Sequence, residues 1–224
     1  MKLLLSIFFT IALTLSLHAQ TQIQINGDHK EDASQTKYSY HFDNEKFTTP
    51  HLEISFDAAG KGEFKFKKKE LDEMTNKIEV SSTVLEQINS ILTEVSYFES
   101  SENYQHKKDF SHLGTITIDI AKSGKHRKVT FNYTENIAMN RLANIFRNLA
   151  TQEMRVFELE AVRQTDPIST PAQLRYLESE MKSKNIADPE RFTPILKDIN
   201  QDESVPLIAR NHAKRLLDQI QKSK

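Results

Sequence analysis

The N-terminal stretch of the chain is apolar and carries a single charged side chain. Lys2 precedes a run from Leu3 to Leu17 that contains only apolar residues, Ser and Thr, and His18-Ala19-Gln20 follows it. A basic residue, a short apolar run and a small residue at its end are typical of a secretory signal peptide. The run is also too short to cross a bilayer comfortably as a permanent helix. We therefore expect residues 1–19 to be a signal peptide and the mature protein to be exported.

Residues 20–50 are polar and weakly patterned, and we treat them as a polar N-terminal arm. Tyr38, Tyr40 and Phe42 alternate with polar residues. Short strands and a flexible arm both fit this pattern, and the sequence leaves the two interpretations open.

Two later segments alternate apolar and polar residues, as strands with one buried face do. In the first, residues 51–67, the alternation continues on both sides of a glycine-bearing turn at 58–62. In the second, residues 115–133, Ser123 and Gly124 form the turn. The sequence predicts two β-hairpins.

Each hairpin is followed by apolar residues at the helical period. The first helix has capping-box spacing between Thr83 and Glu86, and the second starts near Asn136 and runs to about Val162. Two-stranded hairpins are not stable alone, and pairing them gives the helices a sheet to cover. We predict an α+β domain over residues 51–163, a four-stranded antiparallel sheet with both helices on one face (ββαββα).

The C-terminal part is punctuated by proline, with five of the six prolines after residue 164. Helix starts are indicated at Thr170-Pro171, at Pro194 after a short turn, and near Pro206. The last two helices have a short connection, which favours antiparallel packing. We expect residues 164–224 to form a small all-α helical-hairpin region.

Three stretches of the α+β part resemble a family of exported bacterial domains of unknown function. In that family a helix ends in an aromatic residue, and a Tyr-containing loop leads to a Thr-rich strand, a Lys/Arg-Val strand and a closing helix. The matching stretches are Phe98-Glu99-Ser100-Ser101-Glu102-Asn103-Tyr104, Leu113-Gly114-Thr115-Ile116-Thr117-Ile118 and Arg127-Lys128-Val129-Thr130-Phe131-Asn132-Tyr133.

The resemblance covers roughly His51 to Val162. Many relatives carry a Cys-x-Gly-x-Cys-Pro opening before the first strand, where this chain has only Pro50-His51-Leu52. The tail from Asp202 to Ala213 also looks like one unit of a HEAT-like helical repeat. The resemblance implies an exported protein with this fold, and it implies no reaction.

Composition excludes several kinds of chemistry. The chain has no cysteine, so lipid attachment at a cysteine, disulfides, thiol catalysis, cysteine-based zinc sites and iron–sulfur clusters are excluded. No apolar run after Gln20 has the length of a transmembrane helix. The 30 basic residues nearly balance the 31 acidic ones, which gives no indication of a nucleic-acid partner. We predict no cofactor.

The candidate metal site is a loop in which His106 and His112 flank Asp109. Imidazole and carboxylate are ligands for zinc and related ions. The spacing is not a recurrent ligand spacing, so solvated loop histidines are the competing interpretation. The chain has no Gly-x-Ser-x-Gly, His-Glu-x-x-His or Ser-x-x-Lys motif with its usual partners, and no catalytic residue is predicted.

Basic side chains cluster near both hairpin turns. Together they are candidates for one cationic patch facing an anionic envelope partner if the hairpins pair side by side. The competing interpretation is that lysines on sheet edges and solvent faces prevent aggregation. The candidate residues are Lys61, Lys65, Lys67, Lys125, Arg127 and Lys128.

Three functional hypotheses follow. The first is a soluble, non-catalytic exported protein that binds an envelope or extracellular component, either a protein or an anionic polysaccharide. The second is a metal-dependent or other hydrolase that uses the loop 104–112. The third is a self-associating structural protein. The sequence does not decide the oligomeric state.

Overall fold

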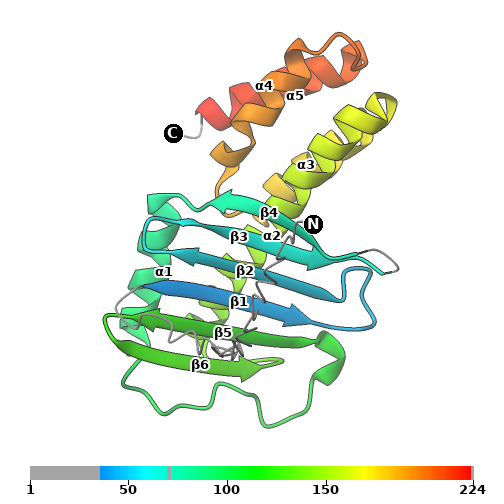
Figure 1. Ribbon diagram of the computed structural model, residues 1–224. Coiled ribbons are helices and arrows are strands. Elements are labelled where there is room, and N and C mark those ends of the chain that lie inside the picture. The colour runs from blue at the N-terminus through cyan, green and yellow to red at the C-terminus, as the bar shows by residue number, and fades with distance from the viewer. Residues whose placement is uncertain (1–35, 70–71, 223–224) are drawn as a thin grey trace, which may run out of the picture. The chain divides into compact units, whose positions relative to one another are not determined.

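Within the residues that the structure describes, six antiparallel strands form one sheet in the order β4-β3-β2-β1-β5-β6 (Figure 1). The computed structural model describes residues 36–69 and 72–222, so the predicted signal peptide and residues 20–35 lie outside the described part. The α+β prediction is confirmed, but the prediction of four strands is wrong. The strands are β1 (Lys37–Asp43), β2 (His51–Asp57), β3 (Lys61–Lys67), β4 (Met74–Glu79), β5 (Thr115–Lys122) and β6 (Lys125–Phe131).

The two predicted hairpins exist as β2–β3 and β5–β6, and β1 lies between them. Tyr38 and Tyr40 of β1 are buried, so the weak alternation in this segment marks a central strand. β4 extends the other side of the first hairpin through a short run whose apolar positions are only Met74 and Ile78. The hairpins are therefore not neighbours. The strand between them, β1, lies in the segment predicted to be a polar N-terminal arm.

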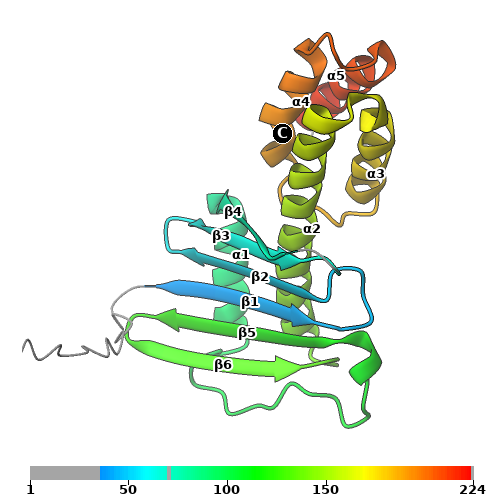
Figure 2. The ribbon, with the colours of Figure 1, turned by 45° about the vertical axis from the view of Figure 1, so that its right-hand side comes forward.

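Two helices, α1 (Ser82–Glu94) and α2 (Ile137–Thr165), pack side by side on one face of the sheet (Figure 2). The side chain of Asn136 caps α2 by accepting a 2.9 Å hydrogen bond from the amide of Met139. α1 begins earlier than the capping-box spacing suggests, with Ser81 at the N-cap and no side-chain cap bond.

The strand register places apolar side chains in rows across the covered face. One row runs through Phe64, Ile54, Tyr40, Ile118 and Val129, all of which are buried under the helices. The next row, nearer the end of the strands, runs through Phe66, Leu52, Phe42, Ile116 and Phe131. Leu52 and Phe42 in this second row are only partly buried.

The C-terminal helices enclose a second apolar core. They are α3 (Thr170–Lys182), α4 (Thr193–Gln201) and α5 (Leu207–Lys222), with short 3-10 turns at Pro167–Ser169 and Pro189–Phe192. The predicted short turn before a helix near Pro194 is confirmed. None of the helices in the described ranges is long and apolar enough to cross a membrane.

α2 belongs to both cores. Leu149 and Ala150 pack in the core beneath the sheet, whereas Val156 and Leu159 pack with the C-terminal helices. The expected boundary after residue 163 therefore falls inside a helix of 29 residues.

Candidate functional site

A cleft of about 980 Å³ opens where β1 ends and β2 and β5 begin. Its floor includes Phe42, flanked by Leu52 on β2 and Ile116 on β5, which the register places directly opposite Phe42. We call it the Phe42 cleft. The floor is apolar because these residues belong to the second row of the covered face, in which Phe42 and Leu52 stay partly exposed.

One wall of the Phe42 cleft is a face of α2. Asn140, Arg147, Thr151 and Met154 line it, and their spacings of seven, four and three residues place them on one side of the helix. The helix thus presents a mixture of polar, cationic and apolar groups to the apolar floor.

The opposite wall consists of two loops that one buried side chain joins. Asn44, at the start of the β1–β2 loop, donates from Nδ2 to the carbonyl oxygen of His112 at 3.1 Å. Its Oδ1 accepts from the amide of Lys46 at 3.0 Å. Phe47 from the first loop and Leu113 from the second line the cleft, so Asn44 joins the two loops that carry these apolar groups.

The third side is an aromatic cluster at the end of β6. The rings of Phe110 and Tyr133 lie 4.8 Å apart, and the His106 ring contacts both of them at 5.2 and 5.5 Å. Tyr133 lines the cleft. The loop that contains the predicted metal ligands therefore supports the wall of an apolar cleft.

Positive charge predominates among the ionisable side chains that line the cleft. Arg155 is engaged by Glu180 at 3.5 Å and by Glu158 at 2.5 Å. Arg147 bonds the side-chain oxygen of Asn144 at 2.6 Å. Within the described residues, neither Arg147 nor Lys46 has a carboxylate partner.

Tyr40 lies at the base of the cleft, where only 1% of it is exposed. Its ring stacks on Phe146 at 5.4 Å with an interplanar angle of 5°. Burial raises the pKa of the Tyr40 hydroxyl to about 12, although the neighbouring Arg147 guanidinium partly offsets this effect. The hydroxyl is therefore neutral at ordinary pH and can donate a hydrogen bond.

The predicted metal residues do not converge. His106 has both ring nitrogens occupied, because Nε2 lies 2.9 Å from Glu135 Oε1 and Nδ1 accepts from the amide of Lys108 at 2.8 Å. Asp109 caps the short turn at Ser111, and the side chain of His112 is exposed. No three His, Asp or Glu side chains are arranged to hold a metal ion in the part of the chain that the structure describes.

The predicted cationic patch is divided between distant strands. Three strands separate β3 from β6, which is roughly 19 Å at the usual strand spacing. Arg127 also points to the helical side, where it donates to the carbonyl oxygens of Tyr97 and Glu102. The residues concerned are Lys61, Lys65 and Lys67 on β3 and Lys125, Arg127 and Lys128 on β6.

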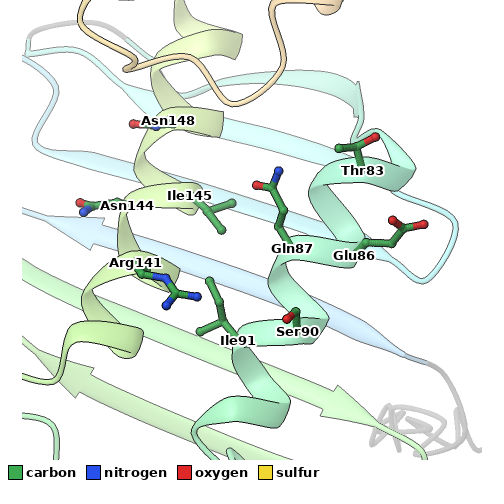
Figure 3. A pocket seen from close by; sticks show the side chains of 9 residues that line it. All are labelled: Thr83, Glu86, Gln87, Ser90, Ile91, Arg141, Asn144, Ile145 and Asn148. Atoms are coloured by element: carbon green, nitrogen blue, oxygen red, sulfur yellow. The ribbon is translucent and has the colours of Figure 1, made fainter. Parts of the chain in front are cut away.

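A second hollow of about 580 Å³ lies between α1 and α2 (Figure 3). Seven of its nine lining residues are polar, and several of them already have hydrogen-bond or ion-pair partners. Arg141 pairs with Glu94 at 3.0 Å, and Asn148 donates to the carbonyl oxygen of Lys184 at 3.0 Å. We regard this hollow as a solvated groove between two packed helices.

A scan against models of known protein families finds no match to the chain, and a search of curated proteins finds none. The geometry of the Phe42 cleft is therefore the basis for a functional proposal.

Sequence reasoning missed the residues that build the cleft. Asp43-Asn44 between two alternating segments was a usable turn signal, and it marks the loop that carries Lys46 and Phe47. Nothing in the sequence separates Arg147 from the other polar residues of α2, because its position opposite Phe42 depends on the tertiary fold.

Proposed function

We propose that this protein is a non-catalytic binding protein whose Phe42 cleft holds the apolar body of a small molecule. The observation that carries the proposal is the clustering of exposed large apolar side chains at the mouth of the cleft. Phe47, Leu113 and Tyr133 are 47%, 42% and 39% exposed, and all three line it. Exposed apolar groups gathered around a concave site are typical of ligand-binding surfaces.

The lining supports binding better than catalysis. Catalysis by a nucleophile needs an activating base within hydrogen-bond reach. The hydroxyl groups in the lining are those of tyrosine and threonine, and the carboxylate, Glu180, already bonds Arg155 and Asn185. The alternative hydrolase on the loop 104–112 has less support, because the ring nitrogens of His106 are both engaged.

We further propose that the protein acts after export and that its ligand is a component of the cell envelope or the medium. This part rests on the signal-peptide pattern of residues 1–19 and on the resemblance to exported domains. The HEAT-like interpretation of the C-terminal helices stays a prediction.

The test is binding of a neutral apolar fluorophore, N-phenyl-1-naphthylamine, to the chain of residues 20–224. We expect a saturable rise in fluorescence that Thr151→Trp abolishes, because the new ring fills the cleft beside α2. Ser90→Trp is the matched control, since Ser90 lines the hollow between α1 and α2 (Figure 3). Thermal melts of both variants show that each is folded.

Absence of binding to the unmodified chain would overturn the proposal. A loss of binding in Ser90→Trp with none in Thr151→Trp would place the ligand elsewhere and would overturn it too.

A further inference from the structure

We propose that the ligand of the Phe42 cleft is a single-chain amphiphile with a carboxylate head, of the fatty-acid class. The carboxylate would lie against Arg147 with Lys46 at the mouth, and the aliphatic chain along the floor formed by Phe42 and its neighbours. This inference rests on the proposed function and specifies the ligand class for the same cleft.

The unmatched positive charge is the first argument. Arg155 in the lining already bonds Glu158 and Glu180. Arg147 and Lys46 line the same cleft with no carboxylate partner among the described residues. Both side chains are exposed, so an anionic head group would meet two cations that no carboxylate of the described residues engages.

The geometry around Arg147 is the second argument. Its Nη1 bonds Asn144 Oδ1 at 2.6 Å, and the guanidinium also hydrogen-bonds the Tyr40 hydroxyl. These two contacts orient the guanidinium and leave its remaining N–H groups for a ligand. A guanidinium fork matches the two oxygens of a carboxylate. The Tyr40 hydroxyl accepts from Arg147, so its own O–H can serve as one more donor at the buried base of the cleft.

The floor favours an aliphatic chain over a peptide terminus. At Phe42 the strand β1 is paired with β2 on one side and with β5 on the other, so the backbone under the cleft is occupied by the sheet. A peptide would bring amide groups that need hydrogen-bond partners, and burying them unpaired is costly. An aliphatic chain has no such groups and gains from contact with Phe42, Leu52 and Met154.

The experiment is displacement of N-phenyl-1-naphthylamine by three probes with the same twelve-carbon chain, each below its micelle concentration. They are dodecanoate, dodecanol and dodecyltrimethylammonium. We expect dodecanoate to displace the fluorophore at about a tenfold lower concentration than dodecanol, as one charged hydrogen-bonding contact implies. The cationic probe should bind more weakly than either.

Arg147→Met keeps the aliphatic stem and removes the charge. It should retain fluorophore binding and lower the preference for dodecanoate over dodecanol from about tenfold to about threefold, and Lys46→Met should reduce the preference about threefold. Lys128→Met is the control, because Lys128 pairs with Asp119 in the β5–β6 register on the opposite face of the sheet.

Each result has one meaning. Equal displacement by dodecanoate and dodecanol would overturn the carboxylate assignment and leave the binding proposal intact, whereas failure of the fluorophore to bind would remove both. Persistence of the preference in both Arg147→Met and Lys46→Met, or its loss in Lys128→Met, would also overturn the assignment. If Arg147→Met does not fold, Lys46→Met decides it.

Discussion

Asn44 donates its side-chain amide to the carbonyl oxygen of His112 across 68 positions of sequence, and only 8% of Asn44 is exposed. This bond joins the β1–β2 loop to the loop before β5. The same two loops carry Phe47 and Leu113, which line the cleft.

Asn44→Ala should lower the free energy of unfolding by about 1–3 kcal/mol, because it leaves a carbonyl and an amide without their partner. It should also weaken N-phenyl-1-naphthylamine binding, since the outer wall loosens. Urea unfolding and fluorescence titration measure the two effects. Asn211→Ala, at an exposed position of α5, is the control and should change stability by less than about 0.5 kcal/mol. Equal effects of the two substitutions would contradict the role given to Asn44.

Gly114→Ala should disturb the floor of the cleft directly. Gly114 has φ 91° and ψ 178°, a region that is essentially restricted to glycine. A Cβ there would lie 2.7 Å from Phe42 Cε2 and 2.8 Å from the carbonyl oxygen of Asp43. We expect a loss of about 2–5 kcal/mol in unfolding free energy from strain and overpacking together, measured by urea unfolding.

Gly124→Ala tests the effect of a positive φ without steric contact to a neighbouring residue. Gly124 also has a positive φ, 75°, but nothing lies within 4 Å of its added Cβ, so only about 1–2 kcal/mol should be lost. A loss at Gly124 as large as at Gly114 would show that contact with Phe42 is not the cause.

Arg191→Met should be among the most destabilising charge removals. Glu153 is 3% exposed, and Arg191 holds both of its carboxylate oxygens at 3.1 and 3.0 Å. Removing the arginine leaves the buried Glu153 carboxylate without its partner, which should lower the free energy of unfolding by about 3–5 kcal/mol. Replacing both partners with methionine should restore most of the lost stability. Arg141→Met, which breaks an exposed pair, should cost less than about 1 kcal/mol. A double variant no more stable than Arg191→Met alone would contradict this account.

The pKa values of two histidines should lie on opposite sides of the ordinary value of 6.5. A hydrogen bond to Asp43, 2.6 Å long, raises the pKa of His51, so its contribution to stability is complete below about pH 6.5 and is lost as pH rises through the raised pKa. Burial lowers the pKa of His212, and the effect of nearby Arg215 adds to it despite the pairing with Glu178. Its contribution is complete above about pH 6.5 and is lost as pH falls towards the lowered pKa.

NMR titration of the ring protons measures both pKa values in the folded protein. The variants His51→Gln and His212→Gln assign the titration curves, because each should remove the curve of one histidine. A pKa for His212 above that of His51 would contradict the prediction.

Periodicity was sufficient for the elements that bury one complete face. The hairpins, the long helix capped by Asn136, and the short turn before Pro194 follow from local residues and are present. The two missing strands had weaker local signals. In β1 the buried side chains Tyr38 and Tyr40 alternate with polar residues in a polar segment. β4 has few apolar residues because it lies at the sheet edge.

The cleft could not be predicted from the sequence, for a different reason. It depends on which strands are neighbours, and inserting β1 brings Phe42 between Leu52 and Ile116. The same insertion separates the lysines of β3 from those of β6. The central position of β1 therefore places Phe42 in the floor of the cleft and separates the residues of the predicted cationic patch.

The continuous α2 contributes side chains to both cores. A gene cut after residue 163 would produce a first fragment with Val156 and Leu159 bare and a second fragment without the helix that completes its interior. We therefore expect neither half to fold as an independent module. A ligand that immobilises Met154 in the cleft acts only two residues from Val156, so amide exchange in the C-terminal helices should slow when the cleft is filled.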